Sequence, residues 1–197
     1  MPATMDLCSL DEVKTSPAIR SLQGIAVNPI DEEFLQLSIK SVSQRFENFA
    51  RSWFAKNTYT ELFSPEPGSR VVILRARPIT SITTLIESVT GDFVTGNEYG
   101  PTEWGLDLNS GVVTLRYFQY LGGPQTLQIT YVGGYDVIPD DIKMAAILQV
   151  GHEFQAAAKS WVKTEVTSGG GQATYQPLNL LPAVCGILSA YRPYTNY

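Results

Sequence analysis

The residues that could perform chemistry in this sequence are few and poorly placed for most known sites. The chain has one histidine, His152, and two cysteines, Cys8 and Cys185, near opposite ends. His152 and Glu153 begin an H-E-x-x-H zinc motif, but Ala156 stands where its second histidine would be. Because one histidine and two distant cysteines cannot form the usual zinc ligand sets, we predict no metal site. We interpret His152 as a structural or surface residue on a helix.

Motifs for nucleophilic catalysis and for phosphate binding also lack their partners. A serine–histidine–acid triad would have to use His152, and no G-x-S-x-G sequence supports it. The glycine-rich run that starts at Ser168 has no following lysine and no preceding strand, so it is not a P-loop. Gly133 and Gly134 precede a helix start with two aspartates, which would repel a phosphate. We predict no cofactor and no catalytic residue.

Acidic residues leave one enzymatic alternative open. A pair of carboxylates can hydrolyse a glycosidic bond when their spacing is right, and the middle of the chain holds six candidates. Acids in β-rich loops are usually solvated, so a hydrolase is the less favoured hypothesis. The candidates are Glu61, Glu87, Asp92, Glu98, Glu103 and Asp107.

Basic residues form one cluster, at Arg70, Arg75 and Arg77. On an extended strand the side chains of Arg75 and Arg77 would project to the same face. The whole chain carries 14 basic and 19 acidic residues, a net charge of −5, which argues against binding that depends on phosphate neutralisation. We therefore expect Arg75 and Arg77 to pair with carboxylates, within one subunit or between subunits.

The composition is that of a globular protein. The chain has 197 residues, 44% of them hydrophobic and 17% charged, which is enough for a sizeable core without metal or disulfide staples. No stretch approaches the 18 apolar residues of a membrane span, and the first residues resemble no secretory signal. The cysteines are expected to be free, buried thiols of a reducing compartment; one bridge joining the chain ends is the alternative.

Helical patterns occur at the N-terminal end of the chain. Ser9 and Glu12 form a capping box, which predicts a first helix running toward Pro17. Three acids from Asp31 to Glu33 suit the positive end of a second helix. Apolar residues then recur at steps of three and four over about five turns. These stripe positions are Leu35, Ile39, Val42, Phe46, Phe49 and Trp53.

The middle of the chain has strand patterns instead. β-Branched residues are concentrated in segments 59–63, 71–74 and 79–89, which prolines and glycines separate. Asn109-Ser110-Gly111 lies between two further apolar runs and predicts a hairpin turn. The segment from Thr126 to Tyr131 alternates apolar and polar residues cleanly. We expect an antiparallel β unit.

The C-terminal part returns to a helical pattern. Pro139, Asp140 and Asp141 start a helix that we expect to continue to about residue 166, and a glycine-rich loop follows it. A short closing helix is expected over 180–191. The predicted fold is α+β: residues 1–56 and 138–197 supply helices that pack as one bundle, and residues 57–137 form an inserted antiparallel β domain.

The last seven residues contain three tyrosines and an arginine, at positions 191, 192, 194 and 197. Tyrosine and arginine are enriched among the residues that dominate binding energy in interfaces. The segment is interpreted either as an arm for another chain or as a tail that docks on its own subunit.

Several segments, in order along the chain, resemble the head–tail connector (adaptor) proteins of tailed bacteriophages. Met5 to Lys14 is similar to the opening "L-I-T-L-E-E-A-K" type segment of that family, and Asp31 to Ala50 resembles its acidic-start helix. Arg77 to Ile82 is similar to its "R-P-I-x-S-I" strand. Ile129 to Ala146 looks like its strand, G-Y turn, proline and helix, and Leu181 to Arg192 resembles its closing helix ending in "Y-R".

The resemblance implies a structural role in the virion, at the phage neck, for a protein made in the host cytoplasm. Such adaptors form a ring, commonly of twelve copies, beneath the portal protein. They extend the DNA channel and offer a platform for a stopper or tail protein below; double-stranded DNA passes through without specific binding, and no membrane is involved. Carboxylates facing the bore would repel DNA and let it slide. Another neck protein, either a stopper or a tail-completion protein, is the alternative within this class; a stopper would be mostly β.

Three sets of contact residues are inferred from this. The loop Ser168, Gly169, Gly170, Gly171 and Gln172 is expected to reach a neighbouring subunit or the lumen. Arg75 and Arg77 are expected to form ion pairs between subunits. Portal binding is assigned to the closing helix and tail, through Leu180, Leu181, Val184, Leu188, Tyr191, Arg192, Tyr194 and Tyr197.

Overall fold

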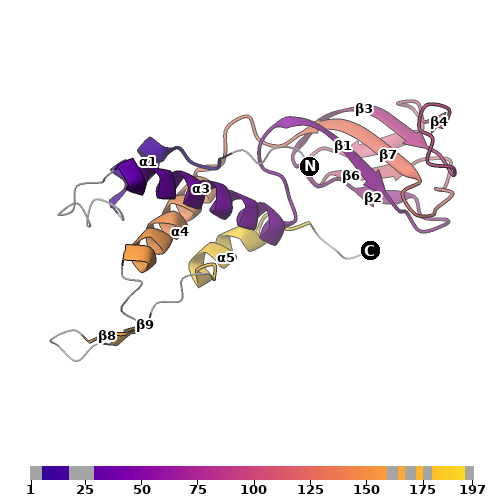
Figure 1. Cartoon of the computed structure of the whole chain (residues 1–197). Helices are drawn as coiled ribbons and strands as arrows, with labels where there is room; N and C mark the ends of the chain where they lie inside the picture. The colour runs from indigo at the N-terminus through magenta and orange to yellow at the C-terminus, as the bar shows by residue number, and fades with distance from the viewer. Residues whose placement is uncertain (1–5, 18–28, 159–163, 167–171, 175–178, 194–197) are drawn as a thin grey trace. The chain divides into compact units, whose positions relative to one another are not determined.

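A computed structural model of the chain describes residues 6–17, 29–158, 164–166, 172–174 and 179–193. The described residues separate into two compact units. The first, called the β unit, comprises Arg51–Ile138 with Arg192 and Pro193. The second, called the helical unit, contains the described part of 6–50 together with that of Pro139–Tyr191. Helices and antiparallel sheets are both present (Figure 1), so the α+β class is confirmed.

The helical unit begins with the short helix α1 (Leu10–Thr15). Its capping box forms as predicted: the Ser9 hydroxyl accepts from the Glu12 backbone N–H, and the Glu12 carboxylate accepts from the Ser9 N–H. α1 contacts both α3 (Pro29–Ala50) and α4 (Asp140–Ala158). Two ion pairs accompany these contacts, Lys14 with Glu32 at 2.5 Å and Lys143 with Glu12 at 2.8 Å.

α3 follows the predicted apolar stripe through most of its length. Leu35, Ile39, Val42 and Phe46 are all buried. The helix ends at Ala50 because Arg51 adopts a left-handed backbone conformation (φ 51°), which a right-handed helix cannot continue. Trp53 was expected on the stripe but lies beyond the helix, in the β unit, where it forms a β-bridge with Ala76.

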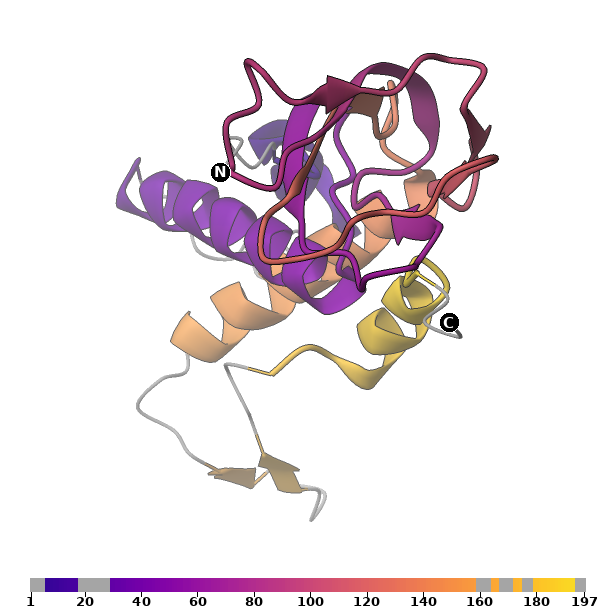
Figure 2. The ribbon, with the colours of Figure 1, turned by 90° about the vertical axis from the view of Figure 1, so that its right-hand side faces the viewer.

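α3 and α4 cross in both views of the molecule (Figures 1 and 2), and each also contacts the closing helix α5 (Pro182–Ser189). α4 begins where Pro139, Asp140 and Asp141 predict, and Ile142, Ala146 and Val150 are buried as expected. None of the described helices is both long and apolar enough to cross a membrane.

The C-terminal end of α4 differs from the prediction. The helix ends at Ala158, and residues expected to be helical form strand β8 (Thr164–Val166). β8 pairs antiparallel with β9 (Gln172–Thr174), so Gln172 lies in a strand although it was assigned to an irregular loop. Threonine and valine occupy three of these six positions, and β-branched side chains favour strands over helices. Trp161 and the Ser168 to Gly171 part of the predicted loop lie outside the described residues.

The β unit contains two antiparallel sheets. In one the strand order is β1 (Asn57–Phe63), β7 (Leu127–Gly133), β3 (Ile79–Glu87) and β4 (Asn97–Glu98). In the other it is β2 (Val71–Ile73), β6 (Val112–Leu115) and β5 (Trp104–Asp107). Side chains from both sheets build one core, to which β7 contributes Leu127, Ile129 and Tyr131 from a single face, as its alternation predicts.

The predicted hairpin turn joins β5 to β6, and Gly111 takes the positive φ (69°) that such turns need. Arg75 and Arg77, in contrast, are not on a strand: they lie in the irregular connection between β2 and β3, which contains the cis peptide Arg77–Pro78. The prediction that their side chains project from the same face of a strand is therefore wrong.

Candidate interaction surfaces

Side chains suited to metal binding do not converge in the described part of the chain. No group of three or more His, Cys, Asp or Glu residues there could hold a metal ion. Nδ1 of His152, on α4, is buried without a hydrogen-bond partner. The two cysteines are free; Cys8 is buried and Cys185 is half-buried. Burial and nearby carboxylates raise the pKa of the Cys8 thiol to about 12, so it is un-ionised and unreactive at neutral pH.

Glu61, one of the candidate catalytic acids, is held by structural hydrogen bonds. Its carboxylate accepts from the Arg75 backbone N–H at 3.0 Å and from the Tyr131 hydroxyl. Burial raises the pKa of Glu61, and the two donors partly oppose that change. The same Tyr131 oxygen accepts from the Ala76 N–H at 2.9 Å. The cluster fixes the connection between β2 and β3 against the central strand β7.

Arg75 also stacks on an aromatic ring within its own unit. Its guanidinium carbon lies 4.7 Å from the centre of the Trp53 ring, and Trp53 stacks in turn on Tyr59 at 4.6 Å. Arg75 and Arg77 are both half-buried, and desolvation lowers the pKa of Arg77. Much of the Arg75 side chain is therefore engaged in contacts within its own subunit.

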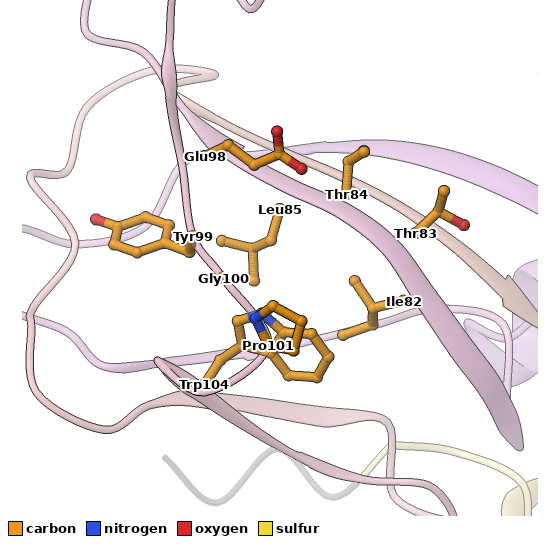
Figure 3. A pocket seen from close by; sticks show the side chains of 9 residues that line it. All are labelled: Ile82, Thr83, Thr84, Leu85, Glu98, Tyr99, Gly100, Pro101 and Trp104. Atoms are coloured by element: carbon orange, nitrogen blue, oxygen red, sulfur yellow. The ribbon is translucent and has the colours of Figure 1, made fainter.

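A small pocket opens between the two sheets (Figure 3). Ile82 and Leu85 line it from β3, Pro101 lies in the segment before β5, and Trp104 is the first residue of β5. Its volume of about 270 Å³ is below the usual range for small-molecule sites. The phenol of Tyr99 points away from the pocket, toward the buried carboxylate of Glu87. This geometry does not favour a substrate site.

Glu87, at the end of β3, organises the long connection between β6 and β7. Its side chain is buried, and its two oxygens accept from the Tyr99 hydroxyl at 2.7 Å and from the Leu121 backbone N–H at 2.8 Å. The connection is also tied to segment 64–69: Tyr120 N–H donates to the Ser69 carbonyl at 2.9 Å, and Gly68 N–H donates to the Tyr120 carbonyl at 3.1 Å.

The connection presents large apolar side chains to solvent. Tyr117 is 71% exposed and Leu121 62%, and Phe118 is exposed between them, while Tyr120 is fully buried and anchors the segment. Residues 116–121 are called the aromatic loop below. Sequence reasoning missed it, although three aromatic residues within four positions outside any predicted strand were a visible signal.

The closing helix α5 is tied to α4 at both of its ends. Gln149 is fully buried in α4, where its amide nitrogen donates to the Asn179 carbonyl at 3.2 Å and its amide oxygen accepts from the Leu181 N–H at 3.0 Å. At the other end the Tyr191 hydroxyl donates to the Asp141 carboxylate at 2.8 Å. The helix is therefore held within the helical unit.

The residues predicted to bind the portal have different environments. Val184 and Leu188 are fully buried, so they pack α5 into its own unit and are not open to a partner. Leu180 and Leu181 are half-buried, as is Tyr191, whose hydroxyl is engaged as described above; Arg192 is exposed. Tyr194 and Tyr197 lie outside the described residues. The exposed positions of α5 are Pro182 and three small residues, Ala183, Gly186 and Ser189, and Ala190 directly after the helix is exposed too.

Comparison with solved structures identifies the class of fold. The chain is similar to one in the neck of an empty gene transfer agent particle computed with C6 symmetry, with TM-score 0.55, 12% identity, and coverage of 94% of this chain and 93% of the other. A chain in the virion of the native particle matches over the same fractions at 12% identity, with TM-score 0.56. A third similar chain is from the native neck computed with C12 symmetry. Its TM-score is 0.51 and its identity 12%, and the match covers 92% of this chain and 93% of the other.

The family follows from the sequence itself. The family model for head completion proteins matches residues 6–194, and the chain belongs to that family. This confirms the resemblance to head–tail connector proteins and makes the chain a structural, non-enzymatic protein. A search of the curated proteins gives no match.

Proposed function

We propose that this chain is a head–tail connector (adaptor) subunit that forms a ring in the neck of a tailed phage or phage-like particle. The observation that carries the proposal is the family match, which covers nearly the whole chain. The similar folds belong to chains in particle necks computed with C6 or C12 symmetry, and this supports a ring whose copy number is a multiple of six, of which we propose twelve. The extent of the helices α3, α4 and α5 favours a connector over a mostly β stopper.

The ring is proposed to lie beneath the portal protein, to extend the DNA channel and to form a platform for a stopper or tail protein. A closed ring needs two different surfaces on each subunit, because every copy contacts its two neighbours through unlike faces. A chain with two compact units offers such surfaces. The net charge of −5 suits a channel wall, since carboxylates facing the bore repel DNA and let it slide.

Portal binding is proposed for the outer face of α5 and the tail that follows. α5 is fixed at both ends by Gln149 and Tyr191, so its exposed face is formed before assembly. Small residues on that face let a partner helix approach closely. Leu180, Leu181 and Arg192 are the other described residues of the proposed contact, and Tyr194 and Tyr197 follow them in the sequence. The loop from Ser168 to Gln172 is proposed to reach a neighbouring copy or the lumen, and the outer nitrogens of Arg75 and Arg77 to meet a neighbour's carboxylates.

A truncation tests the portal contact. Removal of residues 192–197 leaves the Tyr191–Asp141 hydrogen bond in place, so the folded unit should melt like the full chain. Ring formation on purified portal protein, followed by mass measurement, should be lost. The matched control is Thr195→Ala, which keeps the tyrosines and the arginine and should dock normally. Undiminished docking of the truncated chain would exclude the tail as a portal contact.

A further inference from the structure

Two exposed apolar surfaces, one in each unit, are not explained by the packing of the chain. The first is the aromatic loop of the β unit, with Tyr117, Phe118 and Leu121 in solvent. The second is on α4, where Met144 is 61% exposed and Leu148 is also exposed. Neighbouring exposed apolar side chains can mark an interaction site, whereas isolated ones are normal on a protein surface.

The aromatic loop is held by hydrogen bonds to neighbouring segments, which makes it suitable for recognition. Glu87 and the backbone of segment 64–69 hold it through hydrogen bonds. Gly122, directly after it, has φ +77°, and a Cβ at this position would lie only 2.6 Å from the backbone nitrogen of Pro67. Because the loop is already ordered, its side chains lose little conformational freedom when a partner covers them.

A positive charge stands at the start of the aromatic loop. Arg116 is exposed, and its Nε donates to the Trp104 carbonyl at 3.1 Å, which orients the guanidinium. Arg116 forms no ion pair with any residue that the structure describes. The surface therefore combines apolar rings with a cation that has no carboxylate partner there.

The α4 surface has the complementary charge. Asp140, Met144 and Leu148 follow one another at intervals of four residues, so they lie along one side of the helix. Asp140 is exposed and, among the described residues, takes part in no ion pair. Met144 and Leu148 are thus two large apolar side chains exposed on successive turns of α4, on the same side as an exposed carboxylate.

We infer that the aromatic loop of one copy packs on the Asp140–Met144–Leu148 side of α4 in the next copy, with Arg116 facing Asp140. The two surfaces are unlike, so the contact is head-to-tail and can close into a ring. Apolar groups meet apolar groups, and the single cation meets a carboxylate. This inference rests on the proposed ring and names the surfaces that build it.

Charge exchange tests the pairing. Ring assembly on portal protein is measured by mass for Arg116→Asp, for Asp140→Arg and for the double variant. Each single change places like charges in contact, so it should weaken assembly by at least about tenfold; the double change should restore it to within about threefold. Lys40→Asp, on the exposed side of α3, is the control and should assemble normally. Thermal melting checks the fold of each variant. If Asp140→Arg melts early, Asp140→Asn is used alone: it removes the attraction without adding repulsion, so it should weaken assembly less than Arg116→Asp does, and normal assembly of Asp140→Asn would count against the contact.

A second readout locates the contact directly. Phe118→Cys and Leu148→Cys are combined in a chain in which Cys8 and Cys185 are changed to Ser, and the assembled ring is oxidised. A ladder of covalent oligomers is expected, whereas Val94→Cys with Leu148→Cys should give none. If the wild-type ring forms but both single charge variants assemble normally and no ladder appears, the inferred contact is wrong and the ring stands. If the wild-type chain never assembles, the proposed function itself is wrong.

Discussion

Gln149 in the helical unit and Glu87 in the β unit have the same structural role but different hydrogen-bonding groups, an amide and a carboxylate. Each is a buried polar side chain that fixes a peripheral segment: Gln149 holds the entry to α5, and Glu87 holds the aromatic loop. Gln149 donates to Glu153 and to the Asn179 carbonyl while accepting from the Leu181 N–H. Glu87 only accepts.

The partners explain the difference in residue type. An amide can donate and accept at once, which a site with acceptors on one side and a donor on the other requires. A carboxylate only accepts, which suits a site where a phenol and a backbone N–H both donate. In both units the segments proposed to contact other chains are thereby fixed in place before assembly.

The largest effect should come from Gln149→Glu. The new carboxylate would be buried beside Glu153 and would lose both donor bonds, so we expect the free energy of unfolding to fall by about 3 to 5 kcal/mol at neutral pH. The loss should shrink in acid, where the new group is protonated and can donate once. Urea titration at two pH values measures this. A loss that is small and independent of pH would contradict the donor role of Gln149.

Gly122→Ala should have the next largest effect and lower the free energy of unfolding by about 2 to 3 kcal/mol. The added methyl group would clash with Pro67, and the backbone at this position has a positive φ, which alanine rarely adopts. Gly91→Ala is a matched control: φ is also +77°, but nothing lies within 4 Å of the added carbon. That control should lose only about 1 kcal/mol. Equal losses in the two variants would show that Pro67 does not confine the aromatic loop.

Glu87→Gln should lower the free energy of unfolding less than Gln149→Glu in α4 does. The Gln oxygen can still accept from the Leu121 N–H, and the amide can donate to Tyr99 if that hydroxyl turns to accept. We expect a loss of about 1 kcal/mol, since a neutral hydrogen bond replaces a charge-assisted one. A loss as large as that of Gln149→Glu, in the same titration, would overturn the explanation by donors and acceptors.

Gly186→Ala should stabilise the isolated chain by about 0.5 to 1 kcal/mol. The glycine lies inside α5, and a Cβ there meets nothing within 4 Å. Thermal melting tests this gain. The same variant, and more so Gly186→Leu, should dock less well on the portal if the outer face of α5 is the contact; unimpaired docking of Gly186→Leu would place the contact elsewhere.

The raised pKa of Glu61 predicts the direction in which its contribution to stability changes with pH. Burial raises its pKa in the folded chain above the ordinary 4.5, so its contribution to stability is complete below that value and is lost as pH rises through the folded pKa. The difference in unfolding free energy, wild type minus Glu61→Gln, should therefore fall as the pH is raised from 4.5. A difference that rises with pH would mean that the two donors outweigh burial.

The sequence is a good guide to features that depend on near neighbours. The capping box of Ser9, the start of α4 and the alternation of β7 involve residues only a few positions apart. The hairpin at Gly111 belongs to the same group. In each case local hydrogen bonds and one buried face determine the element. These features can be read from the types of neighbouring residues and from their spacing in the sequence.

The features that the sequence did not predict depend on distant residues. Gln149 binds Leu181 across 32 positions, and Glu87 binds Leu121 across 34. Periodicity carries no information about such pairs. One missed feature is local instead: Trp53 fits the α3 stripe by spacing, but the left-handed backbone of Arg51 ends the helix before it. The candidate surfaces were missed for a related reason: whether Met144 or Tyr117 is exposed depends on which chain segments pack nearby.

The most direct test of the central claim is the mass of the purified chain, measured alone and after mixing with purified portal protein. We expect a discrete complex on the portal that contains a ring of this chain, with twelve copies. A chain that stays unassembled in the presence of the portal, or that turns over a small molecule instead, would contradict it.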